Sequence, residues 1–360
     1  MNAFSSRYQA VSNAEGMLHA FFDPDNAHVR SFKECYIAIT GDRKCTGRVE
    51  DIDAARFGEM TGFREALTTD ALANVLSSAI RRRMIADYQN RFSRWAVWRK
   101  IASIARDVTD FRTQERTRWG GYGDLPEVSQ GSSYPALTPP TDDVATYSVQ
   151  KRGGTEDITL EAIRADNSEL IRSIPKKLAD TAHRTASKFV LDLIRTNPVI
   201  YDNLPLYDAQ HQNSGSAPLS AVSLAAGINA MRAQGEPGSG DRLDLQPRSL
   251  LVPFDAEETA FNLFRRTTNQ DKTFIQSRKI EIVPIWYWTD PNDWALVADP
   301  AEAPVIELAF LDGQEDPEVF VADNPSAGSL FSHDKLVFKI RHIYGGTVVD
   351  YRGIYKSTVP

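Results

Sequence analysis

The longest continuous helical pattern in the chain occupies residues 167–197, and it constrains the fold more than any other feature. Apolar residues recur there at steps of three and four, which keeps one face of a helix apolar. Asn197 ends the pattern because a residue that precedes proline avoids the α region. Pro175 leaves two readings open: the regular helix begins near Ser173, or it bends at the proline. Such a helix is about 45 Å long, so we expect a strut along which other elements pack.

A compact domain of mixed strands and helices is predicted after this helix, over residues 201–330. The expected helices cover residues 221–234 and 256–266, and the expected strands cover 248–253, 280–286, 294–298 and 305–311. This region carries twenty acidic residues against eight basic ones. Residues 63–106 carry the opposite balance, nine basic against three acidic. Opposed charges of this kind allow copies of a chain to bind one another.

A long β-hairpin is predicted between residues 111 and 161. The segments 111–119 and 145–160 alternate as strands do, and the stretch between them is rich in glycine, proline and serine. An isolated two-stranded hairpin is barely stable in water, so it needs a partner surface, most simply another subunit. The alternative is a flexible surface loop.

The amino-terminal part is predicted to contain a short strand over residues 34–41 and a helix over 69–84. Arg81, Arg82 and Arg83 lie near the end of this helix. In residues 91–106, further basic residues alternate with tryptophans. One reading is an arm whose apolar side docks on a neighbour. The other is direct contact with nucleic acid through the backbone phosphates and stacked bases.

The carboxyl-terminal part reads as two strands, 335–343 and 347–357, which are expected to lie against the long helix. Gly345 and Gly346 interrupt the alternation, which predicts a turn or bulge there.

We find no convincing catalytic motif in the sequence. Asp208, His211 and Ser214 are close in sequence, but the nucleophile-elbow motif G-x-S-x-G is missing, and a triad depends on geometry rather than on sequence distance. His183 falls near the polar flank of the long helix, which is typical of a surface or interface histidine. We therefore predict no catalytic residues and no enzyme activity.

Cofactor, metal and membrane signals are missing from the sequence as well. Neither of the glycine-rich phosphate-binding motifs occurs, and the spacing of His28, Cys35 and Cys45 matches no zinc pattern. No apolar run reaches about 18 residues, so no membrane span is predicted. We expect no cofactor and no metal site, and the pattern favours a structural or assembly role.

The order of these elements resembles the major capsid protein of tailed bacteriophages, which has the HK97-type fold. The similarity is closest to the branch whose capsid protein is encoded with a ClpP-like or Mu-like prohead protease. It is carried by residues 111–128, 151–161, 250–266, 284–300 and 338–356.

This resemblance implies an α+β, HK97-type fold with four parts. They are an N-terminal arm region over residues 1–110, an extended hairpin loop over 111–161, a peripheral domain with a long spine helix over 162–200 and 331–360, and an axial domain over 201–330.

The resemblance also implies the function: a virion protein that self-assembles, in the bacterial host cytoplasm, into an icosahedral shell around double-stranded DNA. Its partners would be its own copies in pentamers and hexamers, DNA bound without sequence preference, the portal, and decoration or scaffold proteins. The candidate subunit-contact residues are Arg116, Arg118, Trp119, Tyr122, Lys151 and Arg152, and the candidate DNA-facing or arm residues are Arg81, Arg82 and Arg83. Two alternatives remain open: an encapsulin-type nanocompartment shell, and a hydrolase that uses His211 and Ser214.

Overall fold

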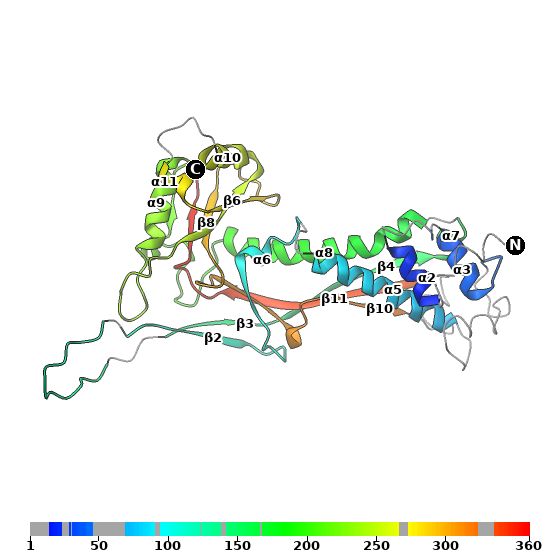
Figure 1. Ribbon diagram of the computed structural model, residues 1–360, viewed down its shortest axis with the longest axis horizontal. Helices are drawn as coiled ribbons and strands as arrows, with labels where there is room; N and C mark the ends of the chain where they lie inside the picture. Colours follow the sequence, from blue (N-terminus) through cyan, green and yellow to red (C-terminus); the bar gives the residue numbers. More distant parts are fainter. Residues whose placement is uncertain are drawn as a thin grey trace. The chain divides into compact units, whose positions relative to one another are not determined.

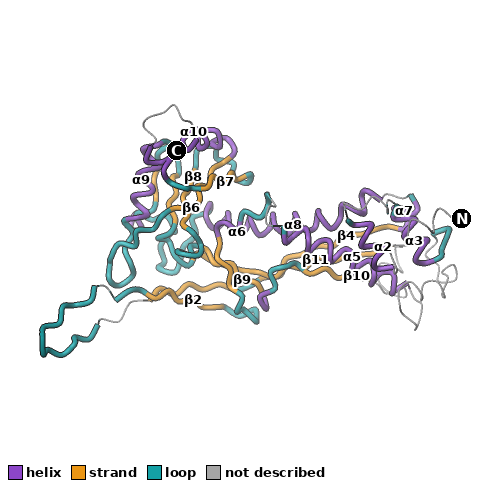
Figure 2. Tube along the Cα trace, viewed as in Figure 1, coloured by secondary structure: helices purple, strands orange, loops and turns teal. Residues whose placement is uncertain are grey.

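The fold is described from a computed structural model of the 360-residue chain. It covers residues 14–23, 29, 31–45, 69–90, 94–122, 124–137, 142–165, 168–265, 273–322 and 335–360. The chain divides into two compact units. The first consists of Met1–Ser93, Lys151–Arg184 and Glu315–Ile343, and the second of Arg94–Gln150, Thr185–Gln314 and Tyr344–Pro360. Helices and strands occur in both (Figures 1 and 2), so the predicted α+β class is confirmed.

The predicted long helix is confirmed as α8, Ser168–Arg195. It begins at Ser168 and contains Pro175, so the reading in which the regular helix begins near Ser173 is wrong. Its apolar stripe is buried at most of the predicted positions, including Ile171, Ile174, Ala182, Val190 and Ile194. Residues up to Arg184 belong to the first unit and the rest to the second.

The first unit also contains a group of helices and three paired strands. The helices are α2 (Ala14–Phe22), α3 (Phe32–Thr40), α5 (Thr69–Gln89) and α7 (Leu160–Arg164). The strands are β4 (Gln150–Thr159), β10 (Glu318–Ala322) and the first part of β11 (Lys335–Val348), and β11 pairs with both of the others. The predicted helix beginning at Thr69 is thereby confirmed.

The prediction of a strand over residues 34–41 is wrong, because this segment is helix α3. Its β-branched and aromatic residues favour a strand, but its two ends favour a helix. Ser31 accepts a hydrogen bond from the Glu34 backbone as an N-cap, and Gly41 closes the helix in the left-handed conformation at φ 77°. Phe32, Cys35 and Ile39 recur at helical spacing and are all buried.

Three aromatic rings, those of Tyr88, His183 and His342, join α5, α8 and β11 in the core of the first unit. The His183 ring lies parallel to Tyr88 with 3.9 Å between centroids, and its Nε2 is 2.7 Å from the Tyr88 carbonyl oxygen. The His342 ring meets the Tyr88 ring edge-on, with 5.8 Å between their centroids. His183 is fully buried, so the expectation of a surface or interface histidine is wrong.

The second unit is built around a sheet with the order β5-β12-β8-β6-β7. Its strands are β5 (Ser214–Gly215), β6 (Pro247–Pro253), β7 (Glu281–Ile285), β8 (Trp294–Ala298) and β12 (Ile354–Ser357). Helices α9 (Ala221–Arg232), α10 (Glu257–Arg265) and α11 (Thr273–Ser277) pack on it (Figure 1), and Leu224, Ile228, Trp294 and Leu296 are at the centre of the core. Short 3-10 turns occur at Ala209–His211, Phe254–Ala256 and Leu311–Gly313.

The position of β12 corrects the sequence prediction. The last strand was expected to return to the long helix, but it pairs with β8 and β5 and is buried throughout. The predicted helices at 221–234 and 256–266 and the strands of this region are confirmed, within a few residues at their ends.

Two further strands of the second unit, β1 and β9, form a ladder beside the end of β11. Helix α6 (Trp98–Ile101) leads directly into β1 (Ala102–Ala105), which pairs in parallel with β9 (Ile306–Phe310). Residues 344–348 of β11 pair with β9 on its other side.

The prediction that Gly345 and Gly346 interrupt the strand is wrong, because β11 runs straight through both. They are needed for close backbone approach instead. A Cβ at Gly345 would lie 2.1 Å from the Ser148 carbonyl oxygen, and one at Gly346 would lie 2.2 Å from that of Glu307.

Candidate subunit-contact site

The predicted hairpin is present as β2 (Gln114–Trp119) and β3 (Asp142–Tyr147), paired antiparallel from Gln114↔Tyr147 to Trp119↔Asp142. Beyond these strands the described loop extends well clear of them (Figure 1). The hairpin is shorter than predicted. The second strand of the hairpin ends at Tyr147, and Ser148 and Val149 separate it from β4. Strand β4 pairs with β11 instead of continuing the hairpin.

The two faces of the hairpin differ in burial. Ala145 and Tyr147 on one face are buried, while Glu115 and Thr117 on the other are exposed. The buried face is the one that carries the arginines, and these are accommodated because acidic side chains of the same unit lie opposite them.

Arg116 is the centre of the first ionic cluster. Its Nη1 donates to Asp107 Oδ2 at 2.7 Å and its Nε donates to Glu307 Oε1 at 2.5 Å. The Tyr147 hydroxyl donates to the same Glu307 oxygen at 2.5 Å. The hydrogen bond from Arg116 holds the pKa of Asp107 below its usual value, and burial together with Glu307 raises the pKa of Tyr147.

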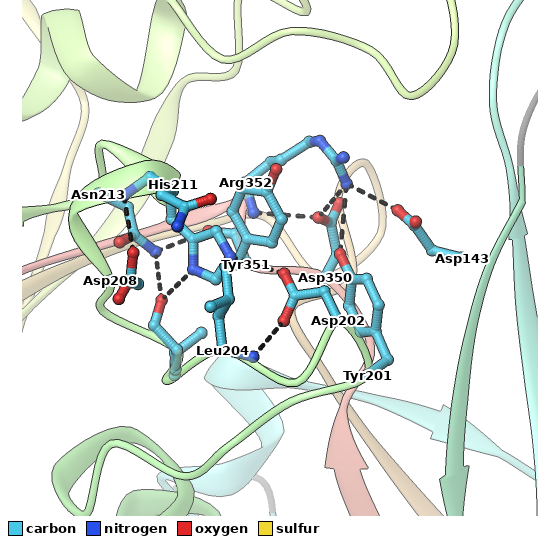
Figure 3. Close-up of polar contacts among 12 residues, drawn as sticks. Asp143, Tyr201, Asp202, Leu204, Asp208, His211, Asn213, Asp350, Tyr351 and Arg352 are labelled. Atoms are coloured by element: carbon cyan, nitrogen blue, oxygen red, sulfur yellow. Dashed lines mark hydrogen bonds and ion pairs between the residues drawn. The ribbon is translucent and has the colours of Figure 1, made fainter.

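Arg352 is the centre of the second cluster, shown in Figure 3. Its Nη1 lies 3.1 Å from Asp143 Oδ2 on β3 and 3.1 Å from Asp350 Oδ1, and it donates to the Tyr201 hydroxyl at 3.4 Å. Arg118 of β2 forms an ion pair with the buried Asp350 from the other side. Burial, with Arg352 close by, lowers the pKa of the Arg118 guanidinium.

The loop leaves β2 against a further acidic side chain, that of Glu236. A Cβ at Gly121 would lie 1.8 Å from Glu236 Oε2, so the backbone passes directly over that carboxylate. Both strands of the hairpin are therefore held to the rest of the second unit by ion pairs. This attachment supplies the partner surface that an isolated hairpin lacks.

The loop exposes apolar side chains. Tyr134 is 87% exposed, Leu125 80% and Tyr122 59%, and Leu137 also faces solvent. Several exposed apolar side chains on one loop favour an interaction surface there. We refer to residues 120–137 as the hairpin tip.

The other predicted site residues lie elsewhere. Trp119 is in β2, and its side chain lies outside the described residues. Lys151 and Arg152 belong to β4 in the first unit, which corrects their assignment to the hairpin. Arg81 and Arg82 are exposed on α5, whereas Arg83 donates to Asp87 Oδ1 at 2.7 Å one helical turn later.

His211, one of the hydrolase candidates, belongs to a polar cluster that Figure 3 also draws. His211 is buried and stacked on Tyr351 at 3.8 Å, with Nδ1 3.0 Å from the Leu206 carbonyl oxygen and Nε2 2.6 Å from Asp202 Oδ2. Both ring nitrogens already face acceptors, so neither is placed to take a proton from Ser214. Asp208 caps the turn at Ala209–His211 through the Gln210 backbone.

The described part of the chain carries neither a metal-ligand cluster nor a membrane-spanning helix. No three His, Cys, Asp or Glu side chains there gather as metal ligands, and His28 lies outside that part. None of the helices in the described ranges is long and apolar enough to span a bilayer.

The acidic partners of the arginines were missed by sequence reasoning. Asp107, Glu307 and Asp350 are far from the hairpin in sequence or have no distinctive motif. The available signal was the presence of Arg116 and Arg118 on the strand face next to buried positions. Arginines on a largely buried strand face need acidic partners.

Comparison with known proteins gives one family match. The model of a family described as phage capsid protein matches residues 143–357, more than half of the chain. No curated protein matches.

Similar solved structures share low sequence identity with the chain. The capsid of an empty GTA particle is 13% identical with a TM-score of 0.48, covering 74% of this chain and 90% of that one. Mycobacterium phage Adephagia is 9% identical with a TM-score of 0.48, and the coverage is the same. The capsid of Myoviridae phage XM1 is 10% identical with a TM-score of 0.47, covering 72% and 90%.

Proposed function

The chain belongs to the phage capsid protein family and is a structural major capsid protein of phage shells. On this premise we propose that copies of the chain close an icosahedral shell through their hairpins, and that the parts of each copy have the roles of the HK97-type fold. In this proposal the hairpin is the extended loop that reaches a neighbouring subunit. The helix α8 is the spine of the peripheral domain, and the sheet of the second unit with α9, α10 and α11 forms the axial domain at the centres of pentamers and hexamers.

One observation carries the proposal: the hairpin is anchored at its base and apolar at its tip. Arg116, Arg118 and Asp143 fix both strands by ion pairs within the chain. The anchored strands therefore hold the loop that carries the exposed side chains of Tyr122, Leu125 and Tyr134. Preorganisation of this kind lowers the entropy cost of each subunit contact, and many modest contacts sum to a stable shell.

The roles of the predicted contact residues are refined accordingly. Arg116 and Arg118 act as anchors of the loop, because their guanidinium groups are engaged within the second unit. Tyr122 contacts the neighbour directly. Lys151 and Arg152 contribute from the sheet of the first unit, where Lys151 is exposed.

The proposed DNA contact rests on the exposed Arg81 and Arg82 of α5. They would contact the packaged double-stranded DNA through phosphates and without sequence preference. Arg83 contributes less, because it pairs with Asp87. The proposal also includes assembly in the bacterial cytoplasm. The further proposed partners are a portal and decoration or scaffold proteins.

The test is particle size and content after expression of the chain. We expect closed shells, or rings of five and six subunits, by negative-stain microscopy and light scattering at moderate salt. A 40.2 kDa monomer that never assembles would contradict the proposal. Nucleic acid inside the shells supports a phage head, and a co-purifying enzyme would support the encapsulin alternative.

A further inference from the structure

The segment in which basic residues alternate with tryptophans packs within the second unit. Ser187 of α8 holds this segment, because its hydroxyl donates to the Trp95 carbonyl oxygen at 2.6 Å and accepts from the Trp98 backbone at 3.2 Å. Trp98 is fully buried, and the Trp95 ring meets the Trp286 ring edge-on, with 5.0 Å between the centroids. The tryptophans therefore pack against their own unit, and base stacking on the buried Trp98 is excluded.

Three cations lie over aromatic rings beside this segment. The Arg94 Cζ is 4.5 Å from the centroid of the Trp95 ring. From α8, the Lys188 Nζ and the Arg195 Cζ lie 5.0 Å and 5.5 Å from the centroid of the Tyr287 ring. The three cationic side chains are exposed, whereas both rings are half-buried. Each ring therefore positions a cation whose charged group still faces water.

Two sets of contacts join these rings and cations into one surface. Trp286 meets Trp95 and is followed in the chain by Tyr287. The Tyr287 hydroxyl donates to Asp192 Oδ2 at 3.3 Å, and Asp192 Oδ1 accepts from Arg195 Nη2 at 2.9 Å. One carboxylate thus accompanies three cations, which leaves the charge positive. We refer to Arg94, Lys188, Asp192 and Arg195, with the rings of Trp95 and Tyr287, as the basic surface.

The basic surface lies at one end of the sheet of the second unit. Tyr287 comes just after the carboxyl end of β7. Near the amino end of β7, Lys100 pairs with Glu281, with 2.6 Å between Nζ and Oε1. Arg248 of β6 lies near that same end and pairs with Asp299. These two cations each have a carboxylate partner, so they provide a contrast with the basic surface.

The chemistry of the basic surface favours a polyanion backbone over a protein partner. Protein partners bind chiefly through apolar anchors. None of the large hydrophobic side chains exposed in the described ranges belongs to α6, to β7 or to residues 185–195 of α8. Contacts to phosphate need only positive charge and hydrogen-bond donors, and guanidinium groups suit phosphate oxygens. Because cations lie over the rings, the surface suits a duplex whose bases remain paired rather than a single strand that stacks its bases.

We propose that the basic surface binds the phosphate backbone of double-stranded DNA, so that this end of the second unit faces the interior of the shell. The surface is separate from Arg81 and Arg82, which belong to the first unit. The choice of double-stranded DNA as the polyanion rests on the proposed function, since a shell that packages a genome meets it. Each contact is small, and the many copies in a shell sum their contributions.

The salt dependence of DNA binding by the unassembled subunit tests the proposal. Fluorescence anisotropy with a labelled duplex of mixed sequence, between about 50 and about 200 mM salt, gives the slope of log K against log salt. Lys188→Gln/Arg195→Gln is expected to make this slope shallower by about 1.8, because each phosphate contact contributes about 0.9. Lys188→Arg/Arg195→Lys keeps both charges and should keep the slope. Arg248→Gln is the control and should bind as the parent does. An unchanged slope in the glutamine variant would overturn the proposal.

A second measurement uses the unaltered chain, so it does not depend on the folding of a variant. Acetylation of lysines, read by mass spectrometry, should modify Lys188 in the free subunit and leave it protected when duplex DNA is bound. Lys279, exposed just before β7, should stay reactive in both states. Equal reactivity of Lys188 with and without DNA would contradict the proposal. Protection by poly-glutamate that equals protection by DNA, charge for charge, would assign the surface to an acidic protein instead.

The outcomes separate this proposal from the function on which it rests. If the parent forms shells while DNA neither protects Lys188 nor loses affinity in the glutamine variant, the basic surface is wrong and the capsid function stands. If DNA protects Lys188 but the parent never assembles, the DNA contact stands and the proposed shell is overturned.

Discussion

Arg352 and Asp143, 209 residues apart in sequence, form an ion pair with 3.1 Å between Nη1 and Oδ2. The pair joins strand β3 of the hairpin to the segment that precedes β12. Arg352 is almost fully buried, and Asp350 and Tyr201 contact the same guanidinium nitrogen. The direction of the hairpin is therefore set by a buried polar network rather than by its own turn.

Removing the charge of Asp143 should loosen the hairpin without unfolding the second unit. We expect Asp143→Asn to cost about 1–2 kcal/mol, because an amide still accepts a hydrogen bond but no longer neutralises Arg352. Hydrogen exchange should become faster in the β2 and β3 amides and remain unchanged in β6 and β8. Asp142→Asn, at the exposed neighbouring position, is the control. Equal exchange in both variants would contradict the anchoring role.

The two carboxylates that hold Arg116 should differ in their contribution to stability. Glu307 is 18% exposed and also accepts from Tyr147, whereas Asp107 is 67% exposed. We expect Glu307→Gln to lower the free energy of unfolding by about 2 kcal/mol and Asp107→Asn by less than about 1 kcal/mol, since water screens the exposed pair. Urea denaturation of the unassembled subunit measures both, and a larger loss for Asp107→Asn would refute this ordering.

Gly345 should not tolerate a side chain. Gly345→Ala forces a Cβ to 2.1 Å from the Ser148 carbonyl oxygen, so β11 must move away from its neighbour. We expect a loss of about 3 kcal/mol or no soluble protein. Gly154→Ala in β4 is the matched control, because its Cβ would meet no atom within 4 Å. Thermal unfolding of the two variants makes the comparison, and similar midpoints would show that the strand adapts.

His342 should make the first unit sensitive to acid. Burial is the main cause that lowers its pKa from 6.5 to about 4, and His183 and Arg152 act in the same direction. The unfolded chain takes up this proton first, so its contribution to stability is complete above about pH 6.5 and is lost as the pH falls toward 4. The full loss is about 3 kcal/mol.

Denaturation at several pH values tests this contribution. His342→Gln should flatten the stability curve between about pH 6.5 and pH 4, because no proton is then taken up on unfolding at this position. His19→Gln, at an exposed site on α2, is the control and should retain the parent curve. An unchanged slope in His342→Gln would assign the acid sensitivity to other groups.

Local periodicity predicted the elements whose own residues determine them. Helix α8 carries an apolar stripe, and β2 and β3 alternate, so both were readable from the sequence. Helix α3 was not predicted, because its residue composition is typical of a strand. The caps at Ser31 and Gly41, which favour the helix, form only when the chain folds. Gly345 and Gly346 gave a turn signal because the sequence does not show which backbone lies beside them.

Sequence reasoning predicted only one side of the ion pairs at the candidate site. The arginines of the hairpin were found, since their spacing is local, but their partners were not. Arg118 meets Asp350 and Arg116 meets Glu307 only because β9, β11 and the segment before β12 come together in the folded second unit. Long-range pairing of this kind leaves no periodic trace in a single sequence.

Electron cryomicroscopy of the assembled shells tests the central claim most directly. The account predicts that density for the loop beyond β2 and β3, including Leu125 and Tyr134, lies over a neighbouring subunit in closed particles. Density for that loop folded back on its own subunit, with no contact to a neighbour, would contradict the role assigned to the hairpin.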